Sequence, residues 1–145
     1  MPNYTMKELL QMVQEKALLY SPERVTSASD VYAALGEYSC KQQEHFMLIT
    51  LDGASHIIEK RVIFIGTLNQ SLVHPREVFH PAIHDNAAGV IIAHNHPSGT
   101  LEASRADIQI TQRLKEVAKL VGIELLDHVI ISKNGYYSFS DEGLL

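Results

Sequence analysis

Two kinds of hydrophobic spacing divide the chain. Apolar side chains recur every three to four positions over residues 5–19 and again over 104–120, which is the spacing of one face of an α-helix. Short apolar runs elsewhere predict strands, and these runs are FMLITLD, HIIEKRVIFIG, AAGVIIAH and ELLDHVIIS. Strands that alternate with helices predict the fold class α/β, with a mixed β-sheet flanked by helices.

Turn residues mark where these elements end. The DGAS stretch at 52–55 separates the first two strand runs and predicts a hairpin. Gly122 follows the last apolar position of the long helix and is well placed to end it. Asn134-Gly135 predicts a tight turn that leads into a final short strand, YYSFS.

Two shorter helices are predicted from capping residues and prolines. Ser29 or Asp30 is expected to cap a helix that reaches Tyr38. Pro75 suits the first turn of a helix in the segment HPREVFHPAIH, and Pro81 is expected to shorten that helix.

The domain organisation is simple. A polar stretch near residue 25 predicts a helical N-terminal extension over 1–25 and one main domain over 26–145. The extension is expected to pack on the body or on a second subunit, so a homo-oligomer is a possible assembly. No apolar run has the length of a signal peptide or a membrane span, so we expect a cytoplasmic protein without membrane contact.

Charge and cysteine content narrow the classes of partner. The chain has 12 Lys+Arg against 17 Asp+Glu, a formal net charge of −5 at pH 7, so direct DNA binding is not expected. Cys40 is the single cysteine, which excludes a disulfide within the chain, and no neighbouring residue would activate it as a nucleophile.

The stretch AHNHPSGTLEASRAD, residues 93–107, carries the candidate chemistry. Alternate residues of an extended segment point to the same side, so His94 and His96 can present two imidazoles to one point at the end of a buried strand. Asp107 lies one turn into the next helix and can return its carboxylate towards this pair. Two histidines, one carboxylate and an open fourth position are typical of catalytic zinc, which activates a bound water.

Hydrolysis at such a site requires a base. Glu44, at the head of the run FMLITLD, and Glu77, in HPRE, are the two candidates. Sequence spacing alone does not choose between them, and the charged pair Arg76-Glu77 could instead contact substrate.

A plainer interpretation of the same stretch is a capped helix after a polar turn. Ser104 and Asp107 have the spacing of a capping box, in which the serine side chain binds a helix N–H group and the acid favours the helix dipole. The two interpretations are compatible, because Asp107 can bind a metal while Ser104 caps the helix.

The remaining histidines have plainer explanations. His128, beside Asp127, is expected to form a hydrogen-bonded pair on a partly exposed face, with support of a metal ligand as the alternative. His45 should point to the opposite face of its strand from Glu44. The three histidines of HPREVFHPAIH are expected to be exposed.

These residues carry a family resemblance. The pattern His94-x-His96, seven residues, Ser104, two residues, Asp107, with a glutamate upstream, resembles the JAMM signature of the JAB1/MPN metallopeptidases. HNHPSG, together with GTLNQSLVHPREVF, AAGVIIA, LLDHVIIS and YYSFS, resembles the RadC-like branch of bacterial JAB-domain proteins. This resemblance covers about residues 40–145.

The resemblance implies a fold, a cofactor and a set of roles. The implied fold is the JAB1/MPN fold, which is cytidine-deaminase-like. His94, His96 and Asp107 would bind one zinc ion, Glu44 would act as general base, and Ser104 would hydrogen-bond the developing oxyanion. The implied activity is that of a zinc-dependent metallohydrolase, a peptidase or isopeptidase acting on a peptide or protein substrate.

Departures from the family pattern leave other functions open. Asn95 stands where JAMM peptidases commonly have Ser or Thr, and no insertion resembles those that grip ubiquitin. Residues 1–39 contain only one glycine, Gly36, so they lack the paired glycines of the DNA-binding helix-hairpin-helix of many RadC-like proteins. The alternative function is a non-catalytic or regulatory binding module associated with DNA repair or replication. A third hypothesis is a purely structural zinc, and it predicts that chelation unfolds the domain.

Overall fold

The computed structural model describes residues 3–19, 24–68 and 73–145. Its helices are α1 (Met6–Leu19), α2 (Ala28–Ala34), α3 (Pro75–His84) and α4 (Arg105–Val121), with a 3₁₀ turn, η1, at Gly36–Tyr38. Its strands are β1 (His45–Leu51), β2 (Ile57–Ile65), β3 (Gly89–Asn95), β4 (Glu124–Ser132) and β5 (Gly135–Ser138).

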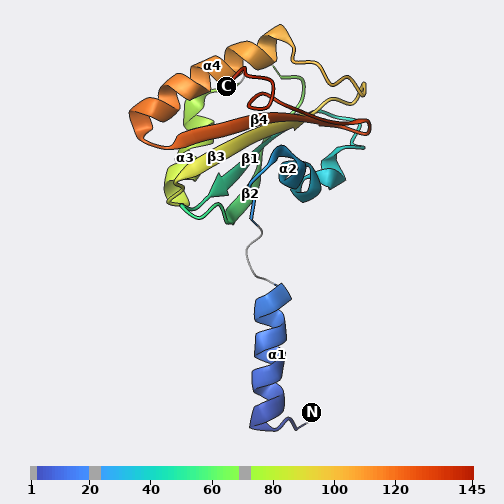
Figure 1. Cartoon of the computed structure of the whole chain (residues 1–145), viewed down its shortest axis with the longest axis vertical. Coiled ribbons are helices and arrows are strands. Elements are labelled where there is room, and N and C mark those ends of the chain that lie inside the picture. Colours follow the sequence, from blue (N-terminus) through green and yellow to red (C-terminus); the bar gives the residue numbers. More distant parts are fainter. Residues whose placement is uncertain (1–2, 20–23, 69–72) are drawn as a thin grey trace.

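The five strands form one mixed sheet in the order β2-β1-β3-β4-β5. Among the strands of the described ranges, only β3 and β4 pair in parallel, and α4 makes the crossover between them. In Figure 1, α3 and α4 lie over one face of the sheet and α2 lies over the other. The predicted α/β class with a mixed sheet flanked by helices is therefore confirmed.

Alternation along the strands produces two hydrophobic cores. One face of the sheet packs against α3 and α4, and the core residues that its strands contribute are Phe46, Leu48, Val90, Ile92 and Leu125. The other face packs against α2, and its strands contribute Met47, Ile49, Leu51, Ile91, Ala93, Val129 and Ile131. Neighbouring residues of a strand thus enter different cores, and this parity decides which side chains meet at the end of β3.

The predicted turns are confirmed, but the predicted cap of the second helix is wrong. The β1–β2 hairpin turns at 52–55, and Gly122 ends α4 in the left-handed conformation, at a φ of 83°. The N-cap of α2 is Ser27, and neither Ser29 nor Asp30 caps it. The Asp30 carboxylate, inside the first turn, instead accepts hydrogen bonds from the N–H and hydroxyl of Thr26.

The prediction for Pro81 is also wrong. Pro75 is in the first turn of α3 as expected, but the helix continues through Pro81 to His84. Proline removes one N–H donor and leaves its carbonyl available, and the carbonyl of Pro81 accepts a hydrogen bond from the N–H of Asp85 at 2.9 Å. Ala82, just beyond the proline, is fully buried, so packing holds this last turn in the helix.

The N-terminal helix exposes apolar side chains. Met6 and Leu10 of α1 are 72% and 56% exposed. Its packing on the body or on a second subunit, and the domain limit near residue 25, stay predictions. No helix in the described ranges is long and apolar enough to cross a membrane.

A buried carboxylate ties α3 to the hairpin. The Asp85 side chain is 4% exposed. It accepts hydrogen bonds from Nε of Arg61 at 3.0 Å, from Nη2 of the same guanidinium, and from the Thr50 hydroxyl at 2.9 Å. The Arg61 guanidinium is the main reason why the pKa of Asp85 lies below its ordinary value.

This network predicts a stability that depends on pH. Because the folded-state pKa of Asp85 is lowered, the ionised carboxylate stabilises the fold above about pH 4, and this contribution is lost as the pH falls through the folded-state pKa. Asp85→Asn should therefore lower the free energy of unfolding by roughly 1–2 kcal/mol at pH 7, less than a fully buried pair because Arg61 is partly exposed. Urea unfolding at pH 7 and pH 3 should show this difference shrinking at the lower pH. The exposed Glu116→Gln is the control, and an equal loss at both pH values would contradict the prediction.

Candidate metal centre

The two histidines lie at the carboxyl end of the central strand. His94 is buried on the face of β3 that packs against α4, and His96 follows the strand directly. The N–H of His96 still donates to the carbonyl of Ile131 in β4 at 2.9 Å, which keeps the backbone extended to this point. Both imidazoles therefore point to the same side of the sheet, as predicted.

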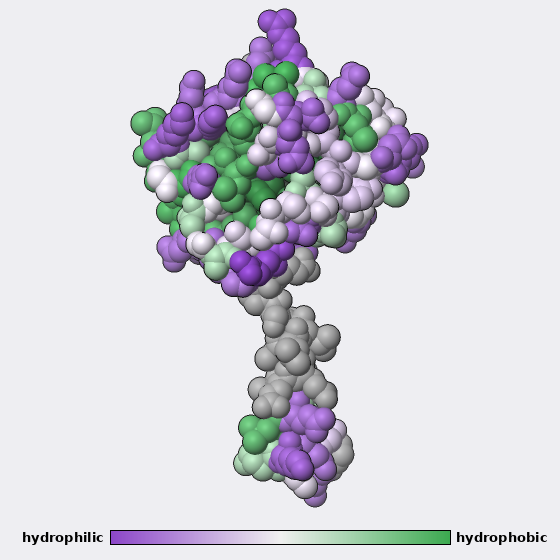
Figure 2. All heavy atoms as spheres, viewed as in Figure 1, coloured by the Kyte–Doolittle hydropathy of each residue, from purple (hydrophilic) through white to green (hydrophobic). Residues whose placement is uncertain are grey.

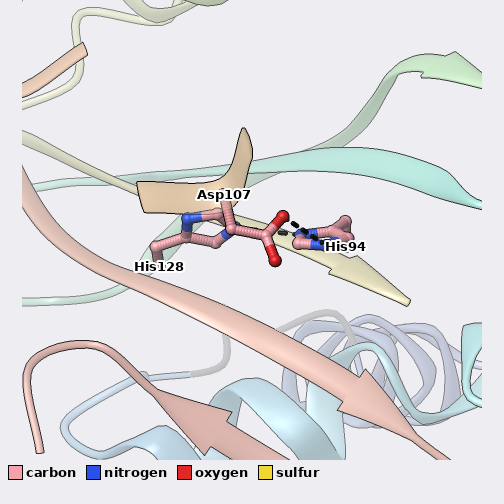
Figure 3. Close-up of side chains that lie close together, drawn as sticks. All are labelled: His94, Asp107 and His128. Atoms are coloured by element: carbon pink, nitrogen blue, oxygen red, sulfur yellow. Dashed lines mark hydrogen bonds and ion pairs between the residues drawn. The ribbon is translucent and has the colours of Figure 1, made fainter. Parts of the chain in front are cut away.

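The N-terminus of α4 brings the carboxylate. Ser104 is the N-cap, its Oγ accepts a hydrogen bond from the N–H of Asp107 at 3.1 Å, and Asp107 Oδ2 accepts one from the N–H of Ser104 at 2.7 Å. The expected capping box is confirmed. The second oxygen, Oδ1, lies 2.9 Å from Nε2 of His94, and Figure 3 shows the carboxylate directed at that ring. Oδ1 is buried, and its contact with His94 does not have hydrogen-bond geometry.

Backbone contacts orient the imidazole of His96. Its Nδ1 lies 3.0 Å from the carbonyl oxygen of Thr100, which can only accept, so Nδ1 carries the proton of the neutral ring. Nε2 is then a lone pair. It lies 2.8 Å from Nε2 of His94 and 3.5 Å from Oδ2 of Asp107.

His128 is part of this cluster, which corrects the prediction of a partly exposed pair with Asp127. The His128 side chain is fully buried, with Nε2 3.0 Å from Nδ1 of His94 and Nδ1 against the hydroxyl of Thr111. Asp127, its neighbour in β4, points to the other face. There its carboxylate accepts hydrogen bonds from the backbone N–H of His128 and from Ser138.

Burial and charge set the ionisation of these groups. Burial opposes ionisation of Asp107, but its contacts with His94 and His96 outweigh this and hold its pKa far below the ordinary value. The interaction with Asp107 raises the pKa of His96. Burial lowers the pKa of His128 well below its ordinary value, so this ring is neutral. The site thus holds one permanent negative charge beside imidazoles.

The donor set fits a metal ion. His94, Asp107 and His128 offer ligand atoms that all lie within 4.8 Å of one another, and Nε2 of His96 is closer still to Nε2 of His94. Imidazole nitrogens and a carboxylate oxygen are common metal ligands. One of these atoms, Oδ1 of Asp107, is a buried acceptor without a hydrogen bond, and a bound cation would supply the partner that it lacks.

A hollow of about 290 Å³ opens beside His96 and Ser104, and Glu44 forms part of its wall. Phe46 pairs with His94 at the end of the antiparallel β1–β3 ladder, and just beyond this end Glu44 and His96 line the same hollow. One carboxylate oxygen of Glu44 accepts the N–H of Leu68 at 2.9 Å.

The other candidates of the sequence lie elsewhere. Glu77 is in the first turn of α3 and is not among the residues that line this hollow. The ring of His45 contacts Tyr38 on the α2 side of the sheet, as expected. His80 and His84 are exposed as predicted, whereas His74, at the start of α3, is half-buried. Cys40 is exposed and unpaired with another cysteine.

Asn95, between the two histidines, has a role that the sequence did not reveal. It is fully buried on the α2 side of β3. Its Oδ1 accepts the N–H of His45 at 2.6 Å, and its Nδ2 donates to the carbonyl of Gln43 at 2.9 Å. The amide thereby fastens the segment on both sides of Glu44 to the strand that carries the histidines. The signal in the sequence was an amide inside a buried run, where a polar group needs partners.

A larger hollow lies away from this chemistry. It measures about 560 Å³ at the opposite end of α4, between that helix and the start of β4, and its apolar lining includes Ala118, Ile123 and Leu125. Figure 2 shows an apolar surface on this side of the body. Its lining contains no histidine, so it does not share the chemistry of the cluster at His94 and His96.

A mixed sheet whose central strand ends in His-x-His, facing a helix capped by Ser104 and Asp107, is the arrangement of a JAB/MPN-type domain. The chain belongs to the family of the RadC-like JAB domain, whose model matches residues 25–144.

Relatives from other organisms agree with this assignment. The chain is 42% identical to a UPF0758 protein of Geobacter sulfurreducens, over 95% of this chain and 61% of that protein. It is 50% identical to one from Clostridium perfringens, over 84% of this chain and 54% of that protein, and 44% identical to one from Thermotoga maritima, over 86% and 56%. The chain thus spans little more than half the length of these relatives, and their names state no activity.

The contacts of Asn95 predict the effect of removing its amide. Asn95→Ala removes two hydrogen bonds to partly buried backbone groups, the N–H of His45 and the carbonyl of Gln43, so the free energy of unfolding should fall by about 1–3 kcal/mol. The His45 amide should also exchange faster with solvent. Urea unfolding and hydrogen exchange test this, with the exposed neighbour Gln42→Ala as the control. Unchanged stability and unchanged exchange at His45 would show that the amide does not hold this segment.

Proposed function

We propose that this domain is a zinc-dependent hydrolase of peptide or isopeptide bonds, with His94, His96 and Asp107 as the metal ligands. One observation carries the proposal. Nε2 of His94 and Nε2 of His96 lie 2.8 Å apart, beside a buried Asp107 oxygen that has no hydrogen bond. Two imidazole nitrogens this close to each other and to a carboxylate oxygen favour a shared cation, and two imidazoles with a carboxylate suit zinc.

His96 is a better third ligand than His128. Both nitrogens of His128 already face partners, Thr111 on one side and Nδ1 of His94 on the other. The Nε2 of His96 has no such acceptor or donor beyond the cluster itself, and His96 borders the hollow through which a substrate would reach the site. With three protein ligands, a fourth position stays open for water, as in catalytic zinc sites.

The remaining residues support acyl transfer. Bound zinc would lower the pKa of a water molecule and polarise the scissile carbonyl. The Glu44 carboxylate, on the wall of the same hollow, is the group that would take the proton of the attacking water and deliver it to the leaving amine. Ser104 Oγ accepts the N–H of Asp107, so its own proton is available for the developing oxyanion.

The metal content tests the ligand assignment. Protein purified without a histidine tag should hold about one zinc per chain by plasma mass spectrometry, and His96→Ala should lose most of it. His80→Ala, which changes an exposed histidine of α3, should retain it. Circular dichroism after chelation should show a folded domain, because the two hydrophobic cores do not include the metal ligands. Absence of zinc from both wild type and His96→Ala, even after zinc is supplied, would overturn the proposal.

The base is tested with Glu44→Gln. On quenched peptide libraries and lysine-isopeptide substrates, this variant should lose about 10²–10⁴-fold in kcat while its zinc content stays unchanged. Glu77→Gln should keep full activity, since Glu77 is not part of the hollow. Equal turnover by Glu44→Gln and wild type would exclude the role of Glu44. Zinc binding without any hydrolysis would instead favour the non-catalytic binding module.

A further inference from the structure

A row of buried contacts leads from His94 into the core, away from the proposed metal. Nδ1 of His94 lies 3.0 Å from Nε2 of His128, and Nδ1 of His128 meets the hydroxyl of Thr111. That hydroxyl donates to the backbone carbonyl of Asp107 at 2.7 Å. The side chains of Thr111, His128 and His94 are at most 2% exposed, so water does not provide alternative partners.

The last acceptor determines where every proton in this row lies. The carbonyl of Asp107 can only accept, so the single proton of the Thr111 hydroxyl points to it. The hydroxyl oxygen is then the acceptor for His128, whose proton must be on Nδ1. Nε2 of this neutral ring is left as a lone pair, and it accepts a proton that His94 carries on Nδ1.

We propose that Thr111 and His128 are positioning residues that hold His94 in its Nδ1–H tautomer and so keep Nε2 free to bind the metal. The reverse arrangement would put the His94 proton on Nε2, 2.9 Å from Asp107 Oδ1, where it would compete with a cation. Since Thr111 is one turn after Asp107 in α4, the same helix supplies one ligand and the anchor that prepares another.

Nuclear magnetic resonance reads this tautomer directly. Long-range ¹H–¹⁵N spectra of the metal-free, ¹⁵N-histidine-labelled protein should show His94 and His128 protonated at Nδ1. In Thr111→Val, which keeps the shape of the side chain but removes the acceptor, both signals should move towards the Nε2–H form. Thr111→Ser restores the hydroxyl and should restore the wild-type spectrum. His94 protonated at Nε2 in metal-free wild type would overturn the proposal.

Zinc affinity gives the second readout. In competition with a chromophoric chelator, Thr111→Val should bind zinc about 10–100-fold more weakly than wild type, and Thr111→Ser should remain within a few-fold of it. Circular dichroism of the metal-free variants checks that both are folded. If Thr111→Val does not fold, the wild-type spectrum still decides the proposal. Equal zinc affinity of folded Thr111→Val and wild type would contradict it.

The inference rests on the proposed function through the assignment of His94 as a ligand, and the two can fail separately. If wild type binds no zinc, the proposed function fails, whereas the spectra of metal-free protein still report the tautomer. If wild type binds one zinc and Thr111→Val binds it as tightly, the metal site stands and the positioning role of Thr111 and His128 is wrong.

Discussion

The burial of one carboxylate is the constraint on which the site depends. Asp107 is 1% exposed, and a buried charge is costly unless hydrogen bonds and opposite charge surround it. One of its oxygens receives the N-terminal N–H of the α4 cap, and the other faces His94. The N-terminus of α4 therefore has to lie beside the carboxyl end of β3, where His94 is. The same carboxylate that fixes the start of α4 also provides the negative charge around which the imidazoles gather.

The parity of the strands distributes the remaining tasks. His94 and His128 share the face that packs against α4, because their strands run parallel with Ile92 opposite His128. Asn95 has the opposite parity, so its amide reaches the backbone around Glu44 from the α2 side. One short segment, His94 to His96, thus serves both faces. Its outer residues form the cluster, while its middle residue anchors the strand that brings Glu44.

Local patterns could be read from the sequence, whereas contacts set by register could not. The mixed sheet, the pair His94 and His96 on one side, and the cap by Ser104 and Asp107 all follow from spacings of a few residues. The meeting of His94 with His128 joins positions 34 residues apart, and it depends on how β3 and β4 align. The sequence predicted a pair of His128 with its neighbour Asp127, but adjacent residues of a strand point to opposite faces of the sheet. At Pro81, packing of the last helical turn outweighed the local preference of proline.

Each imidazole of the proposed metal site uses its two nitrogens differently, and this follows from what surrounds it. A neutral imidazole has one proton, so a protein that holds this proton at Nδ1 leaves Nε2 as a ligand. This requires that the group facing Nδ1 accepts a hydrogen bond and cannot donate one. The carbonyl of Thr100 meets that requirement for His96 directly. Nδ1 of His94 faces the ring of His128 instead, so His128 and Thr111 extend the contact to the carbonyl of Asp107. In both cases the backbone, which has a fixed donor and acceptor character, decides the state of the side chain. The orientation of the proposed ligands is therefore a property of the folded chain and precedes the arrival of a metal.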